Sequence, residues 1–332
     1  MTDAAAISRL NTGYAEARIL HSAVEVGLFE LLSDGPLSAA EIVSRLELHP
    51  RLVGDFLNAL VALGLLTRDG RQYANSTVSQ EVLVPGGPVF LGGRVKATAQ
   101  RHYHTWGKLT EALRDGEPKA AMGLGAMERL YSDPALARAF FAHMDANNAV
   151  VALQLATVVD WSSYKSFVDA GGARGNVAAT LVKAHPHLRG SVMDLGKAEP
   201  LFDELMAERG TTGSVVFHPG DFFTDDLPAA DVIVYGHVLH DWSAEQCQVL
   251  VERAYQALPS GGALVVYDQM LDEESPDLRS LVGSLNVALL SEGGSEYTVA
   301  EFRAWAEKAG FRFDRAERLP RGNDTVAIAH KA

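Results

Sequence analysis

The histidine best placed for proton transfer is His240, in the segment Gly236–Trp242. An apolar run at residues 231–235 precedes this segment, and Ser243 with Gln246 forms a predicted capping box that starts a helix. His240 is thereby expected on a short turn between a strand and a helix. An imidazole with a pKa of about 6.5 is largely neutral at pH 7 and can accept a proton. His240 is therefore a candidate general base.

Three acids, Asp169, Asp194 and Asp221, each follow an apolar run that is predicted to be a strand. In an open α/β sheet, ligands bind beyond the carboxyl ends of the strands. The Gly-rich turn Gly171–Gly175 follows Asp169 and precedes a helix-forming run, an arrangement that holds nucleotide-like ligands. Asp194 has the spacing of an acid that binds a ribose diol. Asp221 could accept a hydrogen bond from an adenine amine, and Phe222 could cover the ring.

The spacing of the glycines after Asp169 differs from that of a dinucleotide-binding turn. A dinucleotide fingerprint has glycines at positions i, i+2 and i+5. Counting from Gly171, position i+5 is Asn176, and Gly175 lies at i+4. An ordinary turn between a strand and a helix is the alternative, but three acids after successive predicted strands favour a ligand site.

Predicted strands and helices alternate through the C-terminal two thirds of the chain. This alternation predicts an α/β fold with a Rossmann-like, mostly parallel and doubly wound sheet. A hairpin near the end of the chain adds one antiparallel strand. After the strand that ends at Asp169, the predicted strands span residues 191–194, 215–218, 231–235, 263–268, 311–318 and 325–330.

The first third of the chain is predicted to be mainly helical. Apolar residues recur at helical spacing over residues 13–33 and 52–66, and Ser38 with Glu41 forms a capping box. Residues 67–73 contain an Asp-Gly hairpin signal. Three helices followed by a hairpin predict a winged helix.

A winged helix can bind DNA or a protein partner, and charge discriminates between the two. Residues 1–80 hold six basic and nine acidic residues and no lysine, whereas DNA affinity depends on clustered basic residues. The apolar helix over residues 52–66 and the apolar stripe over residues 19–32 instead favour packing against a second copy of the chain. We expect a homodimer through this domain. A regulator that senses a nucleotide is the alternative.

Residues 90–160 are predicted to be mostly helical and to link the two domains. Trp106, Phe140, Met144 and Asn148 lie in this segment and are candidates for the wall of a pocket that binds a flat apolar substrate. The alternative is that these side chains belong to the helix core.

Length, charge and cysteine content limit the class of protein. A chain of 332 residues is expected to hold two domains, which we place at residues 1–105 and 106–332. The net charge of −13 disfavours nucleic acid and anionic membranes as partners. The single cysteine, Cys247, excludes an intrachain disulfide and indicates a reducing compartment. We see no secretion signal or membrane span and expect a cytoplasmic protein.

Four segments of the sequence resemble the caffeate- and hydroxyindole-type S-adenosylmethionine-dependent O-methyltransferases, including bacterial members that modify aromatic natural products. These segments are Val168–Gly172, Met193–Leu195, Gly220–Phe223 and Val238–Trp242. The resemblance covers nearly the whole chain. It implies a winged-helix dimerisation domain, a methyltransferase domain, S-adenosylmethionine as the cofactor, and a small aromatic hydroxyl as the acceptor.

The resemblance also implies roles for individual residues. His240 matches the catalytic histidine. Asp268 and Glu296 match the two acids that support it, although glutamate is more usual at the position of Asp268. The positions implied to contact the cofactor are Asp169, Gly171, Asp194, Asp221 and Phe222.

Two positions depart from the family pattern. Ala173 replaces a usual glycine, and its methyl group is expected to fit if φ is negative. Gly236 stands where plant members often carry a lysine near the adenine. These departures leave C-methylation, hydroxylation and cyclisation, on a small aromatic or 2-oxo-acid substrate, open as alternatives. His237 and His240 could also share a metal, but no third ligand has suitable spacing, and we expect that no metal is needed.

Overall fold

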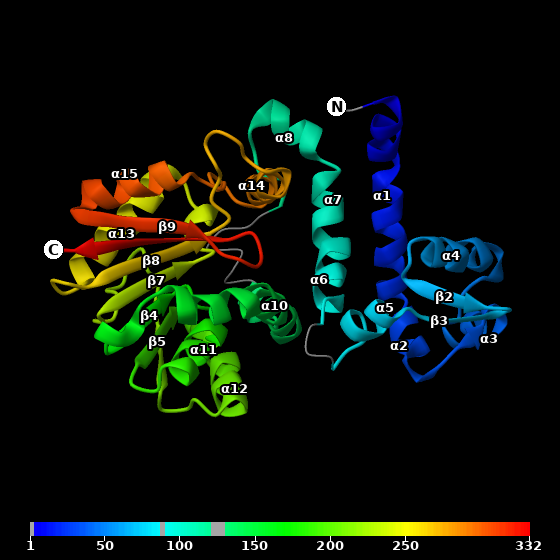
Figure 1. The fold of residues 1–332 in the computed structure, drawn as a ribbon, viewed down its shortest axis with the longest axis horizontal. Coiled ribbons are helices and arrows are strands. Elements are labelled where there is room, and N and C mark those ends of the chain that lie inside the picture. Colours follow the sequence, from blue (N-terminus) through cyan, green and yellow to red (C-terminus); the bar gives the residue numbers. More distant parts are fainter. Residues whose placement is uncertain (1–2, 87–89, 121–129) are drawn as a thin grey trace. The chain divides into compact units, whose positions relative to one another are not determined.

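The computed structural model describes residues 3–86, 90–120 and 130–332 (Figure 1). The chain divides into two compact units, residues 1–104 and 105–332. Each unit buries apolar side chains of its own. Within the described ranges, no helix is long and apolar enough to cross a membrane.

The N-terminal unit contains a winged helix whose wing is a three-stranded antiparallel sheet in the order β1-β3-β2. Leu28, Phe29, Leu57 and Leu60 are buried at its centre. The capping box predicted at the start of α3 is present. The elements up to the unit boundary are α1 (Ala4–Glu25), α2 (Leu28–Leu31), η1 (Leu32–Asp34), β1 (Leu37–Ser38), α3 (Ala39–Arg45), α4 (Pro50–Ala62), β2 (Leu66–Asp69), β3 (Gln72–Asn75), α5 (Thr77–Val82), α6 (Gly92–Ala97), the π-helical η2 (Thr98–His102) and α7 (Tyr103–Trp106).

The first helix differs from the one predicted over residues 13–33. It begins at Ala4, because the side chain of Asp3 accepts a hydrogen bond of 2.8 Å from the backbone N–H of Ala6 and caps the helix. It ends before Gly27, which adopts a left-handed conformation with φ of 74° and starts the separate helix α2. A break at a glycine explains why one predicted helix is two.

The C-terminal unit is built on a seven-stranded sheet in the order β6-β5-β4-β7-β8-β10-β9 (Figure 1). The pairs among β4 to β8 are parallel, and β10 runs antiparallel to both of its neighbours. This confirms the predicted mostly parallel sheet with one antiparallel strand. The strands are β4 (Ser166–Ala170), β5 (Arg189–Asp194), β6 (Val215–Pro219), β7 (Val232–Gly236), β8 (Ala263–Asp268), β9 (Phe311–Arg318) and β10 (Thr325–Lys331).

Helices cover both faces of this sheet because its strands are apolar on both sides. Phe167 of β4 packs in a core with apolar residues of α10, α11 and α12, whereas the next residue, Val168, packs with those of α13 and α15. The helices of this unit include α8 (Leu109–Asp115), α10 (Pro134–Val158), α11 (Asn176–Ala184), α12 (Glu199–Arg209), α13 (Ala244–Ala257), α14 (Leu278–Leu290) and α15 (Val299–Ala309), with 3₁₀ turns η3 (Trp161–Ser163), η4 (Gly196–Ala198) and η5 (Leu239–Asp241).

The strand order reverses between β4 and β7, which are neighbours in the sheet. From β4 the chain proceeds outward through β5 and β6, and it returns to the other side of β4 for β7 and β8. Such a switch point opens a crevice at the carboxyl ends of the strands. Asp169 lies near the end of β4, and His240 follows β7 on η5, so both reach this crevice from the two sides of the reversal.

Candidate active site

Two buried carboxylates lie against the same nitrogen of the His240 imidazole. Its Nδ1 lies 2.8 Å from Oε1 of Glu296 and 3.4 Å from Oδ1 of Asp268. Asp268 is the last residue of β8, and Glu296 lies in the loop between α14 and α15. The side chains of the two acids are 0% and 1% exposed, and that of His240 is 15% exposed. The structure thus brings together the three residues that the resemblance implied.

The two acids are themselves held in place. Tyr297 Oη donates to Oδ2 of Asp268 at 2.6 Å, and the backbone N–H of Glu296 donates to Oγ of Ser284 at 3.2 Å. Oδ1 of Asp268 and Oε2 of Glu296 are buried and have no hydrogen-bond partner among the described residues. Two buried carboxylates with unused acceptor atoms make this a strongly negative environment.

This environment sets the ionisation of the site. Burial by itself would lower the pKa of His240, but the charges of Asp268 and Glu296 and the Glu296 hydrogen bond outweigh it and raise that pKa well above 6.5. Burial raises the pKa of Asp268 to about 7, against the opposing effect of His240. A cation on His240 is therefore favoured in this pocket.

The hydrogen bond to Glu296 assigns the tautomer of His240. A carboxylate oxygen accepts, so Nδ1 carries the proton and Nε2 keeps its lone pair when the ring is neutral. Oδ1 of Asp241 lies 3.9 Å from Nε2. Nε2 is the ring atom that can take a proton from a substrate.

His240, Asp268 and Glu296 also place three ligand atoms within 4.8 Å of one another, a set that a divalent cation could use. The 2.8 Å separation of Nδ1 and Oε1 is that of a hydrogen bond, which needs a proton where an ion would bind. We interpret the three groups as a hydrogen-bonded base, and independence of metal remains a prediction.

A second histidine lies against the first. His237 follows β7 and adopts φ of 52°, a left-handed conformation that is uncommon outside glycine. Its ring stacks on that of His240, with centroids 5.6 Å apart and planes at 17°. Its Nε2 lies 2.6 Å from Oδ1 of Asp324, in the loop between β9 and β10. No local pattern in the sequence marks Asp324 as a residue of the site.

The Gly-rich turn encloses the carboxylate of Asp169. Gly171 has φ of 79°, and its N–H donates to the carbonyl of Met193 at 2.7 Å. A Cβ on Gly172 would lie 2.6 Å from the Asp169 carboxyl group, so a side chain is excluded there. Burial and the charge of Asp194 raise the pKa of Asp169 to about 7, and its buried Oδ2 has no partner among the described residues.

Asp194 holds the same turn from β5. Its Oδ2 accepts from the N–H of Ala173 and its Oδ1 from the N–H of Leu195, both at 2.8 Å, and Tyr131 Oη lies 3.4 Å from Oδ1. Burial raises its pKa to about 6 despite these bonds. Ala173 has φ of 52°, which contradicts the negative φ on which its fit was conditional. The Asp194 hydrogen bond stabilises this conformation.

Phe222 belongs to the same crevice, and Asp221 lies beside it. A Cβ on Gly171 would meet Cγ2 of Val238 at 2.7 Å and the ring of Phe222 at 3.4 Å, so backbone and ring approach closely there. Oδ1 of Asp221 accepts from the N–H of Phe223 at 2.8 Å, which places this acid in a turn. The orphaned Asp169 oxygen, the tight glycines and the buried Asp194 fit a nucleoside-containing cofactor.

The second departure, Gly236, is explained by its neighbour. Gly236 lies opposite Tyr267 on β8, and a Cβ at Gly236 would overlap the tyrosine ring. A side chain at position 236 would require the ring of Tyr267 to move.

Of the four residues predicted to line a substrate pocket, two pack in the helix core and two have a polar atom that is bonded or buried. Phe140 is buried against Tyr131 and Phe141, as expected for the helix core. Met144 is partly buried against the same core. Trp106 donates from Nε1 to Oδ1 of Asn286 on α14 at 3.1 Å, and Oδ1 of Asn148 is buried without a partner among the described residues.

The helix that carries Phe140, Met144 and Asn148 is tied to the Gly-rich turn. Asp145 of α10 accepts from Nε of Arg174 at 2.7 Å. Asp145 and Arg174 are 29 residues apart, and the sequence analysis did not pair them.

Two family models cover most of the chain. The model of the O-methyltransferase domain matches residues 106–312, and that of the O-methyltransferase dimerisation domain matches residues 8–85. The chain belongs to the O-methyltransferase family. This O-methyltransferase is an S-adenosylmethionine-dependent enzyme with the predicted α/β fold and a dimerisation domain.

Individual relatives match this O-methyltransferase over nearly its full length. The N,N-dimethyltransferase OxyT of Streptomyces rimosus is 48% identical over 322 residues, which are 96% of this chain and 94% of OxyT. The tetracenomycin polyketide synthesis 8-O-methyl transferase TcmO of Streptomyces glaucescens is 46% identical over 327 residues, 98% of this chain and 96% of TcmO. The solved structure of human N-acetylserotonin methyltransferase in complex with SAM has a TM-score of 0.90 at 26% identity, covering 100% of this chain and 99% of the human one.

Proposed function

We propose that this O-methyltransferase methylates a phenolic hydroxyl of a small aromatic acceptor in the biosynthesis of an aromatic natural product. The observation that carries the proposal is the hydrogen bond of 2.8 Å between Nδ1 of His240 and Glu296, beside Asp268. It leaves Nε2 to act as the base. The name of TcmO, which describes an 8-O-methyl transferase of polyketide synthesis, supports the class of acceptor.

S-adenosylmethionine supplies an electrophilic methyl group, so the chain has to position the acceptor and remove its proton. Nε2 of His240 takes the proton of the hydroxyl. The imidazolium that results is stabilised by Glu296 through Nδ1–H and by the charge of Asp268 at 3.4 Å. Because both carboxylates are buried, their attraction to the cation is stronger than it would be in water.

The residues proposed to hold the cofactor are those around the Gly-rich turn. The turn offers backbone at Gly171 without a side chain, and Asp194 offers a buried carboxylate for a ribose diol. The ring of Phe222 lies close to Gly171, where it could cover the adenine. Asp169 adds a buried carboxyl group near the turn, and Asp221 remains a candidate for the adenine amine.

We infer that the enzyme is a homodimer through its dimerisation domain. Ile7, Leu10 and Tyr14 of α1 are 61%, 77% and 65% exposed and recur on one helical face. A face of three large apolar side chains on one helix is unusual for a surface that meets only water. The domain carries no lysine before residue 80, which supports a protein partner over DNA.

OxyT, named an N,N-dimethyltransferase, supports a second candidate function, methylation of an amine. An ammonium group must also lose a proton before it attacks, so His240 could serve both reactions. Methylation of a carbon, the earlier alternative, would not require a hydroxyl proton to be removed.

The product distinguishes these reactions. We would incubate the enzyme with S-adenosylmethionine and a polycyclic phenol, the O-methyl ether of that phenol as a matched control, and an aromatic amine of the same skeleton. The proposal predicts that the free phenol alone gains a methyl group, on oxygen, as identified by mass spectrometry and NMR. Methylation of the ether at the same rate would contradict it, and methylation of the amine alone would establish the second candidate.

A further inference from the structure

The two histidines of the site differ in their carboxylate partners. His240 is bracketed by Asp268 and Glu296, whereas Nε2 of His237 is bonded to Oδ1 of Asp324 at 2.6 Å. The side chains of His237 and Asp324 are 10% and 8% exposed. Water does not separate the two partners, so solvent screens their electrostatic attraction only weakly.

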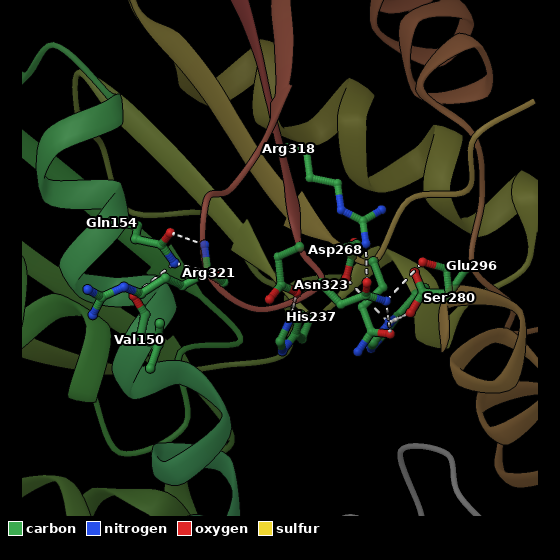
Figure 2. A network of polar contacts seen from close by, with 12 residues as sticks. Val150, Gln154, His237, Asp268, Ser280, Glu296, Arg318, Arg321 and Asn323 are labelled. Carbon is green, nitrogen blue, oxygen red and sulfur yellow. Dashed lines mark hydrogen bonds and ion pairs between the residues drawn. The ribbon is translucent and has the colours of Figure 1, made fainter. Parts of the chain in front are cut away.

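Asp324 is fixed by a loop that is anchored at several points. Its carbonyl accepts from the N–H of Leu319 at 2.8 Å. The neighbouring Asn323 donates from Nδ2 to Oγ of Ser280 on α14 at 2.9 Å (Figure 2). Earlier in the loop, the carbonyl of Arg321 accepts a hydrogen bond from the side chain of Gln154 on α10, and the N–H of Arg321 donates one to that side chain, both at 2.8 Å (Figure 2). The loop therefore presents Asp324 to His237 in one position.

The geometry of His237 is maintained against a conformational cost. A histidine with φ of 52° is strained, and such strain persists only where surrounding contacts fix it. Here the N–H of His237 donates to the carbonyl of Tyr267 at 3.0 Å, and its ring packs edge-on against that of Tyr267. The result is a face-to-face approach to His240, at 5.6 Å between ring centroids.

A general base must be neutral before it can accept a proton, and the carboxylates of this site oppose that. Asp268 and Glu296 stabilise the cation of His240 after proton transfer, but they also stabilise it before the transfer. A positive charge close to the ring would counteract this effect. The ring of His237 stacks on that of His240 and could carry this charge.

We propose that His237 and Asp324 are a positioning pair for His240: Asp324 holds His237 as a cation, and this cation favours the neutral, proton-accepting form of His240. The inference rests on the proposed role of His240 as the base. His237 and Asp324 act through His240 and need not touch the substrate.

The charged groups that face the two histidines come from several elements. His240 faces Asp241 on its own turn, Asp268 on β8 and Glu296 before α15, and all three favour its cation. His237 faces Asp324, Asp268 and the ring of Tyr267, as well as His240 itself. Burial and a charge on His240 would lower the pKa of His237, but the hydrogen bond and charge of Asp324, together with Asp268, outweigh them and raise that pKa. Among these groups, His237 is the one against His240 that can carry a positive charge.

The direction of the effect follows from charge. Asp324→Asn neutralises the pair, and His237→Asn removes the cation while it leaves the Asp324 anion. In both variants the pKa of His240 should rise, by on the order of one pH unit, because a positive neighbour 5.6 Å away is lost. The rise should be larger in His237→Asn. Asparagine is chosen because it tolerates a left-handed conformation.

The test is an NMR titration of the full-length enzyme with labelled histidine, together with the pH dependence of kcat for the parent and both variants. We expect the His240 titration and the acid limb of kcat to move together to higher pH. Gln154→Ala is the matched control, because it loosens the same loop and leaves the pair intact. A His240 titration that is unchanged in Asp324→Asn, or moved equally in Gln154→Ala, would overturn the proposal.

If the proposed role of His240 as the base is wrong, the experiments give a different set of results. If His240 is not the base, His240→Gln keeps the parent rate, while the NMR titration of His240 still responds to Asp324→Asn. If His237→Asn does not fold, Asp324→Asn decides the matter, since asparagine has nearly the same shape as aspartate. Binding of S-adenosylhomocysteine by calorimetry verifies that each variant is folded.

Discussion

Nδ1 of His240 donates to Oε1 of Glu296 at 2.8 Å, across 56 residues of sequence. The bond fixes the proton on Nδ1, so that the other ring nitrogen is available to a substrate. It also means that the base and its orienting carboxylate come from different connections of the sheet, one after β7 and one before α15.

Replacing His240 by glutamine should abolish turnover and preserve cofactor binding. General-base catalysis contributes about 10² to 10⁴ in rate, and that factor should disappear from the chemical step at pH 7. The defect should shrink toward pH 10, where a phenol with a pKa of about 10 ionises without a base. Single-turnover rates from pH 6 to 10, variant against parent, measure this. A variant that methylates at the parent rate at pH 7 would show that His240 is structural.

Replacing Glu296 by glutamine keeps an acceptor for Nδ1–H but removes a buried negative charge. The cation of His240 is then less favoured, so its pKa should fall and the acid limb of the rate profile should move to lower pH. The maximal rate should also fall, by roughly ten- to hundredfold, because the imidazolium formed in the reaction is less stabilised. The exposed Glu292 of the same loop is the control, and an equal effect of Glu292→Gln would refute this explanation.

Asp194→Ala should weaken cofactor binding and leave the enzyme folded. A hydrogen bond to a charged group contributes about 1.5–3 kcal/mol, so the dissociation constant should rise roughly ten- to hundredfold. Asp194→Asn keeps an acceptor for the N–H of Ala173 and should be affected less. Calorimetry checks both variants. If neither changes the constant, Asp194 does not contact the cofactor.

Binding of S-adenosylmethionine should release protons between pH 6 and 7. The pKa of Asp169 is raised to about 7 and that of Asp194 to about 6, and a nearby positive sulfonium would lower both. Affinity should therefore decrease as the pH falls through this range. Calorimetry in buffers of different ionisation enthalpy counts the protons. S-adenosylhomocysteine lacks the positive sulfur, and an equal release with it would refute the prediction.

Leu10→Glu should shift the enzyme from dimer to monomer. Leu10 is 77% exposed on α1, and a charge buried at the centre of an interface would cost at least about 2 kcal/mol. Thr12→Glu, on the opposite side of the same helix, is the control. Light scattering at micromolar concentration reads out the mass. A parent enzyme that is monomeric there would contradict the homodimer itself.

The sequence predicted the parts of the structure that local patterns determine. Strand ends could be located because apolar runs stop at Asp169, Asp194 and Asp268. The pairing of Glu296 with His240 was predicted from the family resemblance alone. The bond between His237 and Asp324 spans 87 residues and has no local signature, so no pattern could reveal it. For Phe140 the sequence leaves both interpretations open, because an apolar residue on a helix looks the same whether it lines a pocket or packs in a core.

The overlap of position 236 with the ring of Tyr267 has a consequence for how such enzymes diverge. A side chain at Gly236 requires a smaller residue at Tyr267, and a smaller residue there leaves a cavity until position 236 is filled. Each single replacement is therefore expected to destabilise the sheet, and the two positions are expected to change together. A larger residue at position 236 is expected only together with a smaller one at position 267, because the two positions lie side by side in the sheet.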